Sequence, residues 1–228
     1  DGAPCEILFQ SFPWDANVNG QKHVWYRHVQ SKVDNLSQVG VTHVWFPPPQ
    51  RSVAPQGYMP GDWYDLGHGQ DLGHNRTLYG NKDELKACIS AFHEKGIKCL
   101  GDIVVNHRCG SHQDNQGNWN IYHFPSGKAK WEQWAIVRGD TGGQGAADTG
   151  GDFGAAPDVD HTNEKVRQDI VDWLNWLKSE VGFDGWRFDY TKGYSGEYAG
   201  EYVEQSSACF SVGELWTSMN YNGSYMLP

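Results

Sequence analysis

Hydrophobic positions follow two different periods along the chain. Short, mostly apolar runs, some alternating with polar residues, are typical of strands, and they occupy 6–12, 41–46, 97–106, 182–192 and 210–216. Between them, apolar residues recur every three or four positions, which predicts helices over 24–39, 81–96 and 162–181 and a weaker one within 198–206. Strands alternating with helices predict βαβ units and therefore a parallel sheet.

Two long segments lack either period. Residues 50–80 form a loop rich in Gly, Pro and aromatic residues, and its aromatic content argues against disorder. Residues 108–156 contain many glycines and few periodic apolar positions. We therefore expect a first part of the barrel over 1–107, an inserted excursion subdomain over 108–156, and the continued barrel over 157–228.

The run 182–192 carries an unusual combination of residues. Arg187 and Asp189 alternate with Trp186, Phe188 and Tyr190, so the charged pair shares one face of the expected strand. Opposite charges on an interior strand are costly unless they are paired with each other or used in function. Taken alone, this segment is equally compatible with a structural Arg–Asp pair.

Two neighbouring strands also end in polar residues. The strand over 97–106 leads into Asn106 and His107, and the strand over 210–216 carries Glu214 near its end. In a parallel α/β barrel the carboxyl ends of all strands lie on one face, where polar residues are typically catalytic. These side chains are therefore expected to converge with Arg187 and Asp189 on one pocket.

Three short motifs carry a family resemblance. Asp102–His107, Gly185–Asp189 and Gly213–Trp216 resemble, in order and approximate spacing, the first three of the four motifs of the α-amylase family of retaining glycoside hydrolases. The resemblance implies an α/β fold of the (β/α)8 TIM-barrel type, with only the first five strands present and a calcium-binding excursion after the third. It is closest to plant and algal α-amylases through the segments 56–60, 106–109 and 155–161.

The resemblance also implies the catalytic roles. Asp189 corresponds to the nucleophile and Glu214 to the general acid/base. Arg187 can pair with Asp189 and keep it ionised, while the apolar neighbours Leu215 and Trp216 are expected to raise the pKa of Glu214. The alternative for Glu214 is a solvated glutamate at a strand end.

Further positions match sugar-binding residues of the family. Tyr58 corresponds to an aromatic floor under the cleaved sugar, and an ordinary packed tyrosine is the alternative. His107 corresponds to a hydrogen-bond donor to sugar hydroxyls, and Lys192 to a residue on the leaving-group side, where plant enzymes commonly carry Arg. Arg187 and Trp216 complete the expected substrate-binding set. His161 could bond sugar or cap the following helix.

A calcium site is implied in the excursion. The resemblance gives Asn106, Asp140 and Asp148 as side-chain ligands, together with a backbone oxygen near Gly193. Ca²⁺ takes six to eight oxygen ligands, and a glycine-rich acidic loop can supply them. Solvated loop acids are the alternative, and the Asp140–Asp148 spacing is shorter than in plant enzymes.

Composition limits the functional classes. A net charge of −10 without a basic run argues against nucleic acid as a partner, and the chain contains no apolar stretch near 18 residues that would span a membrane. Five cysteines without metal-type spacing are expected to be free thiols, with Cys88, Cys99 and Cys209 buried. No signal peptide is visible, and the family favours a secreted or plastid location.

The resemblance stops before the family's fourth motif. The chain has 228 residues, whereas a complete barrel typically needs about 250. It therefore resembles the N-terminal two-thirds of the catalytic domain, and its expected partners are an α-glucan and the missing C-terminal part of the barrel. The predicted function is endo-acting hydrolysis of α-1,4-glucans (starch or glycogen) with retention, weak or absent in this chain alone. A non-catalytic glucan-binding or regulatory protein and a related transglycosylase or α-glucosidase are the alternatives.

Overall fold

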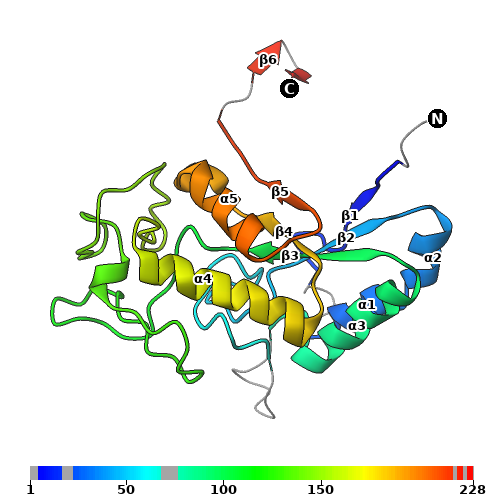
Figure 1. Cartoon of the computed structure of the whole chain (residues 1–228), viewed down its shortest axis with the longest axis horizontal. Helices are drawn as coiled ribbons and strands as arrows, with labels where there is room; N and C mark the ends of the chain where they lie inside the picture. Colours follow the sequence, from blue (N-terminus) through cyan, green and yellow to red (C-terminus); the bar gives the residue numbers. More distant parts are fainter. Residues whose placement is uncertain (1–4, 17–22, 68–76, 218–219, 223–224, 228) are drawn as a thin grey trace.

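The chain folds around five parallel strands in sequence order, which form an open half-barrel (Figure 1). The computed structural model describes residues 5–16, 23–67, 77–217, 220–222 and 225–227. Each strand pairs with the next in parallel register, as the sequence predicts. The five strands are β1 (Leu8–Gln10), β2 (His43–Phe46), β3 (Lys98–Ile103), β4 (Gly185–Phe188) and β5 (Ser211–Gly213).

The helix expected over 24–39 is two helices, α1 (Trp25–Gln30) and α2 (Val33–Gln38). The break between them comes from tighter local bonding. The Ser31 hydroxyl donates to the His28 carbonyl oxygen at 2.6 Å, and the Lys32 N–H donates to the Val29 carbonyl oxygen at 2.9 Å. Bonds to the third preceding residue tighten the turn and interrupt the α-helical pattern.

The other helices lie where the periodicity predicts them. Helix α3 (Lys82–Glu94) begins at a capping box, in which the Asn81 side chain accepts from the Glu84 N–H and Glu84 accepts from the Asn81 N–H. Helix α4 (Glu164–Trp176) widens into a π-helical turn, η2 (Leu177–Val181), that ends at Gly182, whose φ of 106° is unfavourable for other residues. Helix α5 is Gly196–Gln205.

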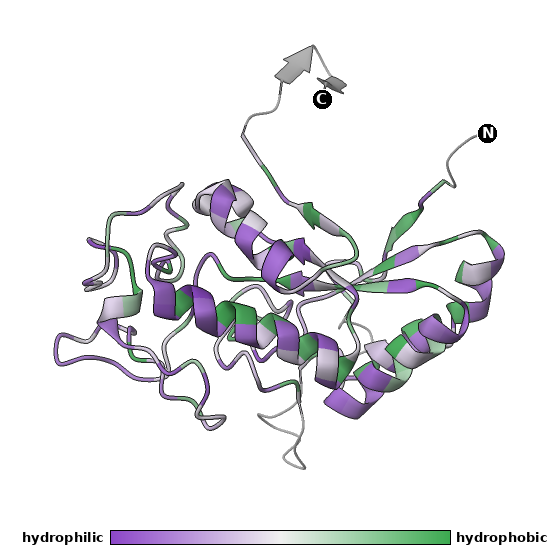
Figure 2. Cartoon of the chain, in the orientation of Figure 1, coloured by the Kyte–Doolittle hydropathy of each residue, from purple (hydrophilic) through white to green (hydrophobic). Residues whose placement is uncertain are grey.

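The core lies between the sheet and the apolar sides of the helices. Figure 2 shows hydrophobic and hydrophilic residues alternating along α3 and α4. The apolar positions that the periodicity predicts for both helices are buried, and Asp169 and Val171 of α4 are buried in addition. The predicted positions include Leu85, Cys88, Ile89 and Phe92 of α3, together with Val166, Ile170, Trp173, Leu174 and, just beyond α4, Leu177.

The excursion over 108–156 is tied to the barrel by a buried cation. It contains the short 3₁₀ turn η1 (Gln133–Ala135) and several isolated β-bridges. The Arg108 guanidinium donates to the carbonyl oxygens of Gly61 and Ala129 at 2.9 and 2.8 Å. It also lies within 5.1 Å of four aromatic ring centres, those of Trp63, Tyr122, Phe124 and Trp131. The boundaries at 107/108 and 156/157 stay a prediction.

Both outer strands of the sheet pair on one side only in the described part of the chain. Phe9 of β1 is 41% exposed and Val212 of β5 is 37% exposed. A closed barrel has no such edges. The prediction that Cys209 is buried is wrong, because this residue precedes the open strand β5 and is exposed; the five cysteines are free thiols.

A hairpin of β6 (Asn220–Asn222) and β7 (Tyr225–Leu227) follows the sheet and stands apart from it (Figure 1). Apolar periodicity does not predict this hairpin, although Asn-Gly at 222–223 is a hairpin signal in the sequence. No helix in the described residues is long and apolar enough to cross a membrane.

The capping box of α3 gives a test of the fold. Replacing Asn81 by Ala removes the acceptor for the Glu84 N–H and should lower the free energy of unfolding by about 1 kcal/mol. Asn81→Ser keeps a capping oxygen and should leave stability nearly unchanged. Urea unfolding of both variants checks this, and equal stabilities would contradict it.

Candidate active site

One guanidinium holds the carboxyl ends of three strands together. Arg187 on β4 places its Nη1 3.0 Å from Asp102 Oδ1 on β3 and 2.9 Å from Asp189 Oδ1, just beyond β4. Its Nη2 lies 3.0 Å from Glu214 Oε2, which follows β5. The prediction that Arg187 pairs with Asp189 is confirmed, and the same side chain also binds two further carboxylates.

Asp102 is the buried anchor of this cluster. It is the register partner of Arg187 in the β3–β4 ladder and is fully buried. Its Oδ2 accepts from Trp45 Nε1 at 2.9 Å and from the Tyr58 hydroxyl at 2.8 Å. The sequence interpretation gave Asp102 no role beyond its place in a motif. An acidic residue surrounded by apolar residues within the strand over 97–106 is the signal for it.

Burial sets the charge of the cluster. Burial first, then repulsion from Asp102, raises the pKa of Asp189, although Arg187 opposes the rise. Burial likewise raises the pKa of Asp102. Although burial disfavours its charge, Arg187 has a raised pKa because Asp102 and Asp189 favour the cation. Arg187 thus favours the ionised form of Asp189, as expected, while burial and Asp102 oppose it.

Glu214 shows the opposite shift from the one expected. Partial burial raises its pKa, but hydrogen bonds from the Tyr190 N–H and the Trp216 indole, together with Arg187, lower it overall. Leu215 is 65% exposed and Trp216 is 51% exposed, so the neighbours expected to form an apolar wall face solvent. The predicted rise is wrong because the residues that would desolvate Glu214 do not cover it.

Backbone contacts fix Glu214 against β4. The Tyr190 N–H donates to Glu214 Oε2 at 3.1 Å, and the Thr191 hydroxyl donates to the Glu214 carbonyl oxygen at 2.6 Å. Tyr190 has a left-handed backbone with φ 48° and ψ 50°. Such a conformation is uncommon for a non-glycine residue and is often found at functional sites. Trp216 Nε1 donates to Glu214 Oε1 at 2.6 Å, which places the indole beside the carboxylate.

Of the expected sugar-binding residues, Tyr58 lies within the cluster. Its hydroxyl binds Asp102, and its ring lies 5.9 Å from both the Arg187 guanidinium and the stacked ring of Trp14, which is 67% exposed. Tyr58 is half-buried. An aromatic face beside the carboxylates is thus available to stack on a sugar ring.

His107 is differently placed. It is fully buried, its Nε2 donates to the Tyr58 carbonyl oxygen at 2.8 Å, and the Phe153 ring stacks on it at 3.7 Å. Burial lowers the pKa of His107 to about 4, so the ring is neutral. In this arrangement His107 positions Tyr58, and Phe153 of the excursion covers one face of the His107 ring.

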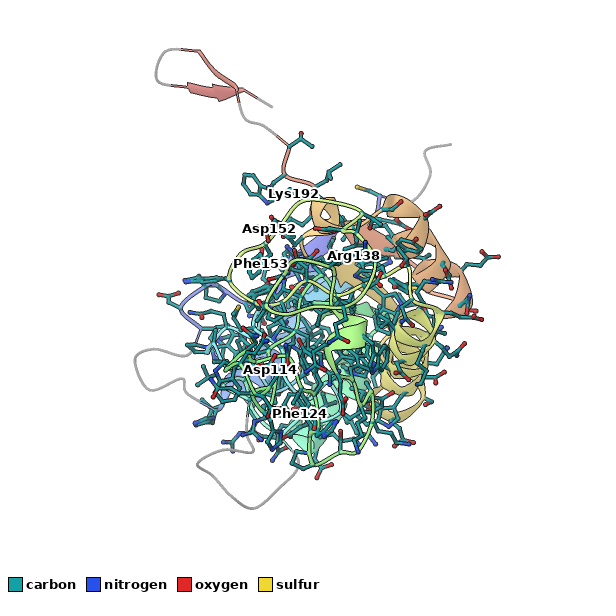
Figure 3. All side chains as sticks on the ribbon, turned by 90° about the vertical axis from the view of Figure 1, so that its left-hand side faces the viewer. Asp114, Phe124, Arg138, Asp152, Phe153 and Lys192 are labelled. Carbon is teal, nitrogen blue, oxygen red and sulfur yellow. The ribbon has the colours of Figure 1, made fainter. Side chains whose placement is uncertain are left out.

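Lys192 and His161 lie in different surroundings, one exposed and the other buried. Lys192 is exposed, with its Nζ 5.1 Å from the Tyr190 ring centre, and Figure 3 shows it on the same part of the surface as Asp152 and Phe153. His161 is buried in a stack with Tyr194 and binds the Tyr202 hydroxyl at 2.6 Å. Asn163, not His161, caps α4.

The excursion carries a group of oxygens suited to a cation. Carboxylate oxygens of Asp140, Asp152 and Asp158 lie within 4.8 Å of one another. The Asn106 side-chain oxygen is buried without a hydrogen-bond partner in the structure. Gly193 packs so closely on this oxygen that a Cβ would collide with it. An unsatisfied buried oxygen beside three acids fits a hard cation such as Ca²⁺.

The pKa of Asp158 reflects its burial and the repulsion between the carboxylates of this group. Burial first, and then the charges of Asp140, Asp148 and Asp152, raise the pKa of Asp158 to about 7. Asp148 is near enough to contribute to this shift but is not one of the three clustered acids, and its Oδ1 accepts from the Gly150 N–H at 3.0 Å. Asp152 and Asp158 were not among the ligands expected from the sequence.

An apolar groove lies on the neighbouring surface. A cavity of about 380 Å³ is lined by Val53, Met59, Cys109, Trp119, Ala155 and adjoining residues. Trp119 is 52% exposed. Met59 directly follows Tyr58 and Cys109 lies two residues after His107, so two of the lining residues are close in the sequence to expected sugar-binding residues.

Comparison with known proteins gives the family. The family description "Alpha amylase, catalytic domain" matches residues 16–212. The chain is 42% identical over 222 residues to "Alpha-amylase 3, chloroplastic" of Arabidopsis thaliana, covering 96% of this chain and 23% of the relative. It is 38% identical over 218 residues to "Probable alpha-amylase 2" of the same plant, covering 96% of this chain and 49% of the relative.

A solved structure agrees on the fold. The crystal structure of alpha-amylase from Geobacillus thermoleovorans in complex with acarbose superposes with a TM-score of 0.66 at 21% identity, over 93% of this chain and 47% of that one. The fold and cluster define a partial barrel with a carboxylate site, and the chain belongs to the alpha-amylase catalytic-domain family. It spans half or less of the length of these relatives.

The shared guanidinium gives a second test. Arg187→Met leaves three carboxylates without their cation and should cost about 3–5 kcal/mol of unfolding free energy at neutral pH. Protonated carboxyls need no cation, so stability of the variant should fall more steeply than that of the parent as pH rises from 4 to 7. Chemical denaturation at both pH values measures this.

The control for Arg187 is Arg27→Met. Arg27 binds Glu84 at 2.8 Å, but its side chain is 62% exposed. Its loss should cost at most about 1 kcal/mol, with little dependence on pH. Equal costs for the two variants would contradict the anchoring by Arg187.

The acidic group gives a third test. The pKa of Asp158 is raised from 3.8 to about 7, so the fold loses stability as pH rises from about 4 to about 7, and a cation bound to the ionised carboxylate should offset this loss. The increase in melting temperature caused by CaCl₂ should therefore be larger at pH 8 than at pH 5.5. Asp158→Asn should abolish most of that increase, whereas exposed Asp83→Asn should not. An increase in melting temperature that is the same at both pH values and is unchanged in Asp158→Asn would contradict the site.

Proposed function

We propose that this chain is the catalytic core portion of an endo-acting α-1,4-glucan hydrolase that retains the configuration of the cleaved bond. The observation that carries the proposal is the Arg187 guanidinium shared by Asp102, Asp189 and Glu214 at the carboxyl ends of three adjacent strands. Structural ion pairs rarely collect three acids around one base, since two of the charges remain unbalanced.

Asp189 is the proposed nucleophile and Glu214 the proposed general acid/base. In the first step Asp189 attacks the anomeric carbon while Glu214 gives a proton to the departing glycosidic oxygen. In the second step Glu214 takes a proton from water, which displaces Asp189. Both carboxylates contact adjacent nitrogens of one guanidinium, and this spacing leaves little room for the water that an inverting enzyme places between them.

A long glucan is the proposed substrate. Exposed Trp14 stacks on the Tyr58 ring, and exposed Trp119 lines the apolar groove that Met59, the neighbour of Tyr58 in the sequence, also lines. Several exposed aromatic faces suit several sugar units and therefore internal cleavage. The curated relatives are named alpha-amylases, which supports the same substrate class.

The chain alone is proposed to be weakly active or inactive. A general acid has to hold a proton near neutral pH, but hydrogen bonds from the Tyr190 N–H and the Trp216 indole, together with Arg187, lower the pKa of Glu214, and exposed Leu215 and Trp216 do not desolvate it. The unpaired edges of β1 and β5 and the stacking of Phe153 on His107 support the same proposal. The C-terminal part of the barrel would supply the residues that shield Glu214 from solvent.

Calcium and location complete the proposal. Asn106, Asp140 and Gly193 from the sequence prediction, joined by Asp152 and Asp158, are proposed to hold Ca²⁺ and so fix the excursion beside the cluster; Asp148 is proposed as an outer contributor. The ion would be structural. A plastid location is favoured over secretion by the chloroplastic name of one relative.

The alternative is a non-catalytic glucan-binding protein. Aromatic residues would suffice for that function, whereas it does not require both Asp189 and Glu214 on Arg187. The enzymatic proposal is therefore preferred over binding alone. A transglycosylase or α-glucosidase would use the same carboxylates and differ in its products.

The test compares this chain with a fusion in which a relative, Arabidopsis alpha-amylase 3, supplies the remaining barrel strands. Reducing ends released from soluble starch with calcium present should be near background for the chain and clearly above it for the fusion. Asp189→Asn and Glu214→Gln in the fusion should each lower the rate by at least about 10³-fold. Glu204→Gln, at an exposed position of α5, is the control.

Several outcomes would contradict the proposal. Variants as active as the parent would remove Asp189 and Glu214 from the mechanism. A folded fusion that binds starch without cleaving it would favour the binding protein. Glucose as the first product, without a rapid fall in starch viscosity, would favour an exo-acting enzyme.

A further inference from the structure

A second cluster of reactive side chains lies at the opposite end of the sheet from the carboxylates. It consists of His93 near the end of α3, Cys99 in β3 and Asp184 just before β4, and we call it the amino-end cluster. One ligand atom from each residue lies within 4.8 Å of the others. Cys99 is at the start of β3, whereas Asp102 and Arg187 are toward the carboxyl ends of β3 and β4.

Asp184 is held rigidly in this cluster. Its N–H donates to the Cys99 carbonyl oxygen at 2.8 Å, and its Oδ2 accepts from the Cys99 N–H at 2.8 Å. Its own carbonyl oxygen accepts from the Cys209 N–H at 2.8 Å. One of these bonds holds the carboxylate directly and the other two fix the Asp184 backbone beside Cys99, as a preorganised site requires.

His93 brings a nitrogen to the same carboxylate. Its Nε2 lies 2.7 Å from Asp184 Oδ2, and its side chain is 37% exposed, against 17% for Asp184. Cys99 is fully buried. The cluster therefore has a buried sulfur at its base and an imidazole on the solvent side, through which an ion could enter.

The donor set is the one that zinc prefers. Zn²⁺ binds Cys sulfur at about 2.3 Å and His nitrogen or carboxylate oxygen at about 2.0–2.2 Å, so donors on one tetrahedral ion lie about 3–4 Å apart. A thiolate and a carboxylate also balance the two positive charges of the ion. Ca²⁺, in contrast, takes only oxygen ligands, and six to eight of them.

We propose that His93, Cys99 and Asp184 form a binding site for a thiophilic divalent cation such as Zn²⁺, separate from the acidic group of the excursion. The fourth position is open to water or to the thiol of exposed Cys209, whose backbone already binds Asp184. The ion would join α3, β3 and the start of β4, and would stabilise the end of the sheet remote from the carboxylates.

Lys98 is a cation that faces the cluster. Lys98 Nζ lies 3.9 Å from Asp184 Oδ1, and its side chain is 52% exposed. It uses the oxygen that His93 does not contact, and a long exposed side chain can turn into solvent at small cost. When the ion binds, the direct contact between His93 and Asp184 would be replaced by bonds from both side chains to the ion.

The test uses Co²⁺ as a spectroscopic substitute for Zn²⁺ on the full 228-residue chain. One equivalent should produce thiolate-to-cobalt charge-transfer absorption together with the strong visible bands of a tetrahedral site. Zn²⁺ should remove both signals, and an excess of Ca²⁺ should not. Metal content measured after dialysis against Zn²⁺ should be close to one ion per chain.

Three variants locate the site. Cys99→Ser should abolish the charge-transfer absorption, and Cys88→Ser, a buried thiol of α3 outside the cluster, should leave it unchanged. His93→Gln keeps an exposed polar residue, so the fold is not threatened, and it should weaken Co²⁺ binding at least about tenfold. Far-ultraviolet circular dichroism confirms that each variant is folded.

Three results would overturn the proposal. The first is a folded parent chain without thiolate-to-cobalt absorption, which would make His93 and Asp184 a simple ion pair. The second is absorption that survives in Cys99→Ser or disappears in Cys88→Ser. The third is displacement of Co²⁺ by Ca²⁺ at equal concentration. None of these measurements depends on hydrolytic activity.

Discussion

The pairing of one buried guanidinium with three carboxylates is the constraint on which the rest of the structure depends. Arg187 has to face Asp102 across the β3–β4 ladder, and this fixes the register of both strands. It also has to reach Glu214, which brings the end of β5 beside β4. A slip of one residue in any of these strands would turn its charged side chain to the other face of the sheet.

The surrounding aromatic residues serve the same cluster. Trp45 and Tyr58 satisfy the remaining oxygen of Asp102, and Tyr190 adopts a strained backbone that aims its N–H at Glu214. Burial raises the pKa of Asp189 and Asp102, whereas hydrogen bonds from Tyr190 and Trp216 and the charge of Arg187 lower the pKa of the less buried Glu214. Which of these two carboxyl groups holds a proton near neutral pH therefore depends on what covers Glu214.

Periodicity and motifs predicted the strands, the long helices and the residues around Arg187, because strand alternation and helical stripes are local properties. The division of 24–39 into two helices depends on individual bonds at Ser31 and Lys32 that periodicity cannot reveal. The role of Asp102 was not predicted because its hydrogen-bond partners Trp45 and Tyr58 are far away in the sequence. Asp152 and Asp158 were not predicted as ligands because the sequence of an irregular loop has no periodicity that indicates which acidic side chains lie close together. The pKa of Glu214 depends on the exposure of its neighbours, which only the folded arrangement shows.

The proposed roles of Asp189 as nucleophile and Glu214 as general acid/base are tested most directly by trapping the covalent intermediate. The chain fused to the remaining strands of the Arabidopsis relative, carrying Glu214→Gln, would be incubated with an α-maltosyl fluoride, whose leaving group needs no acid. Mass spectrometry of peptides should find one maltosyl group on Asp189. A maltosyl group on another residue, or none although fluoride is released with retained configuration, would contradict Asp189 as the nucleophile held by Arg187.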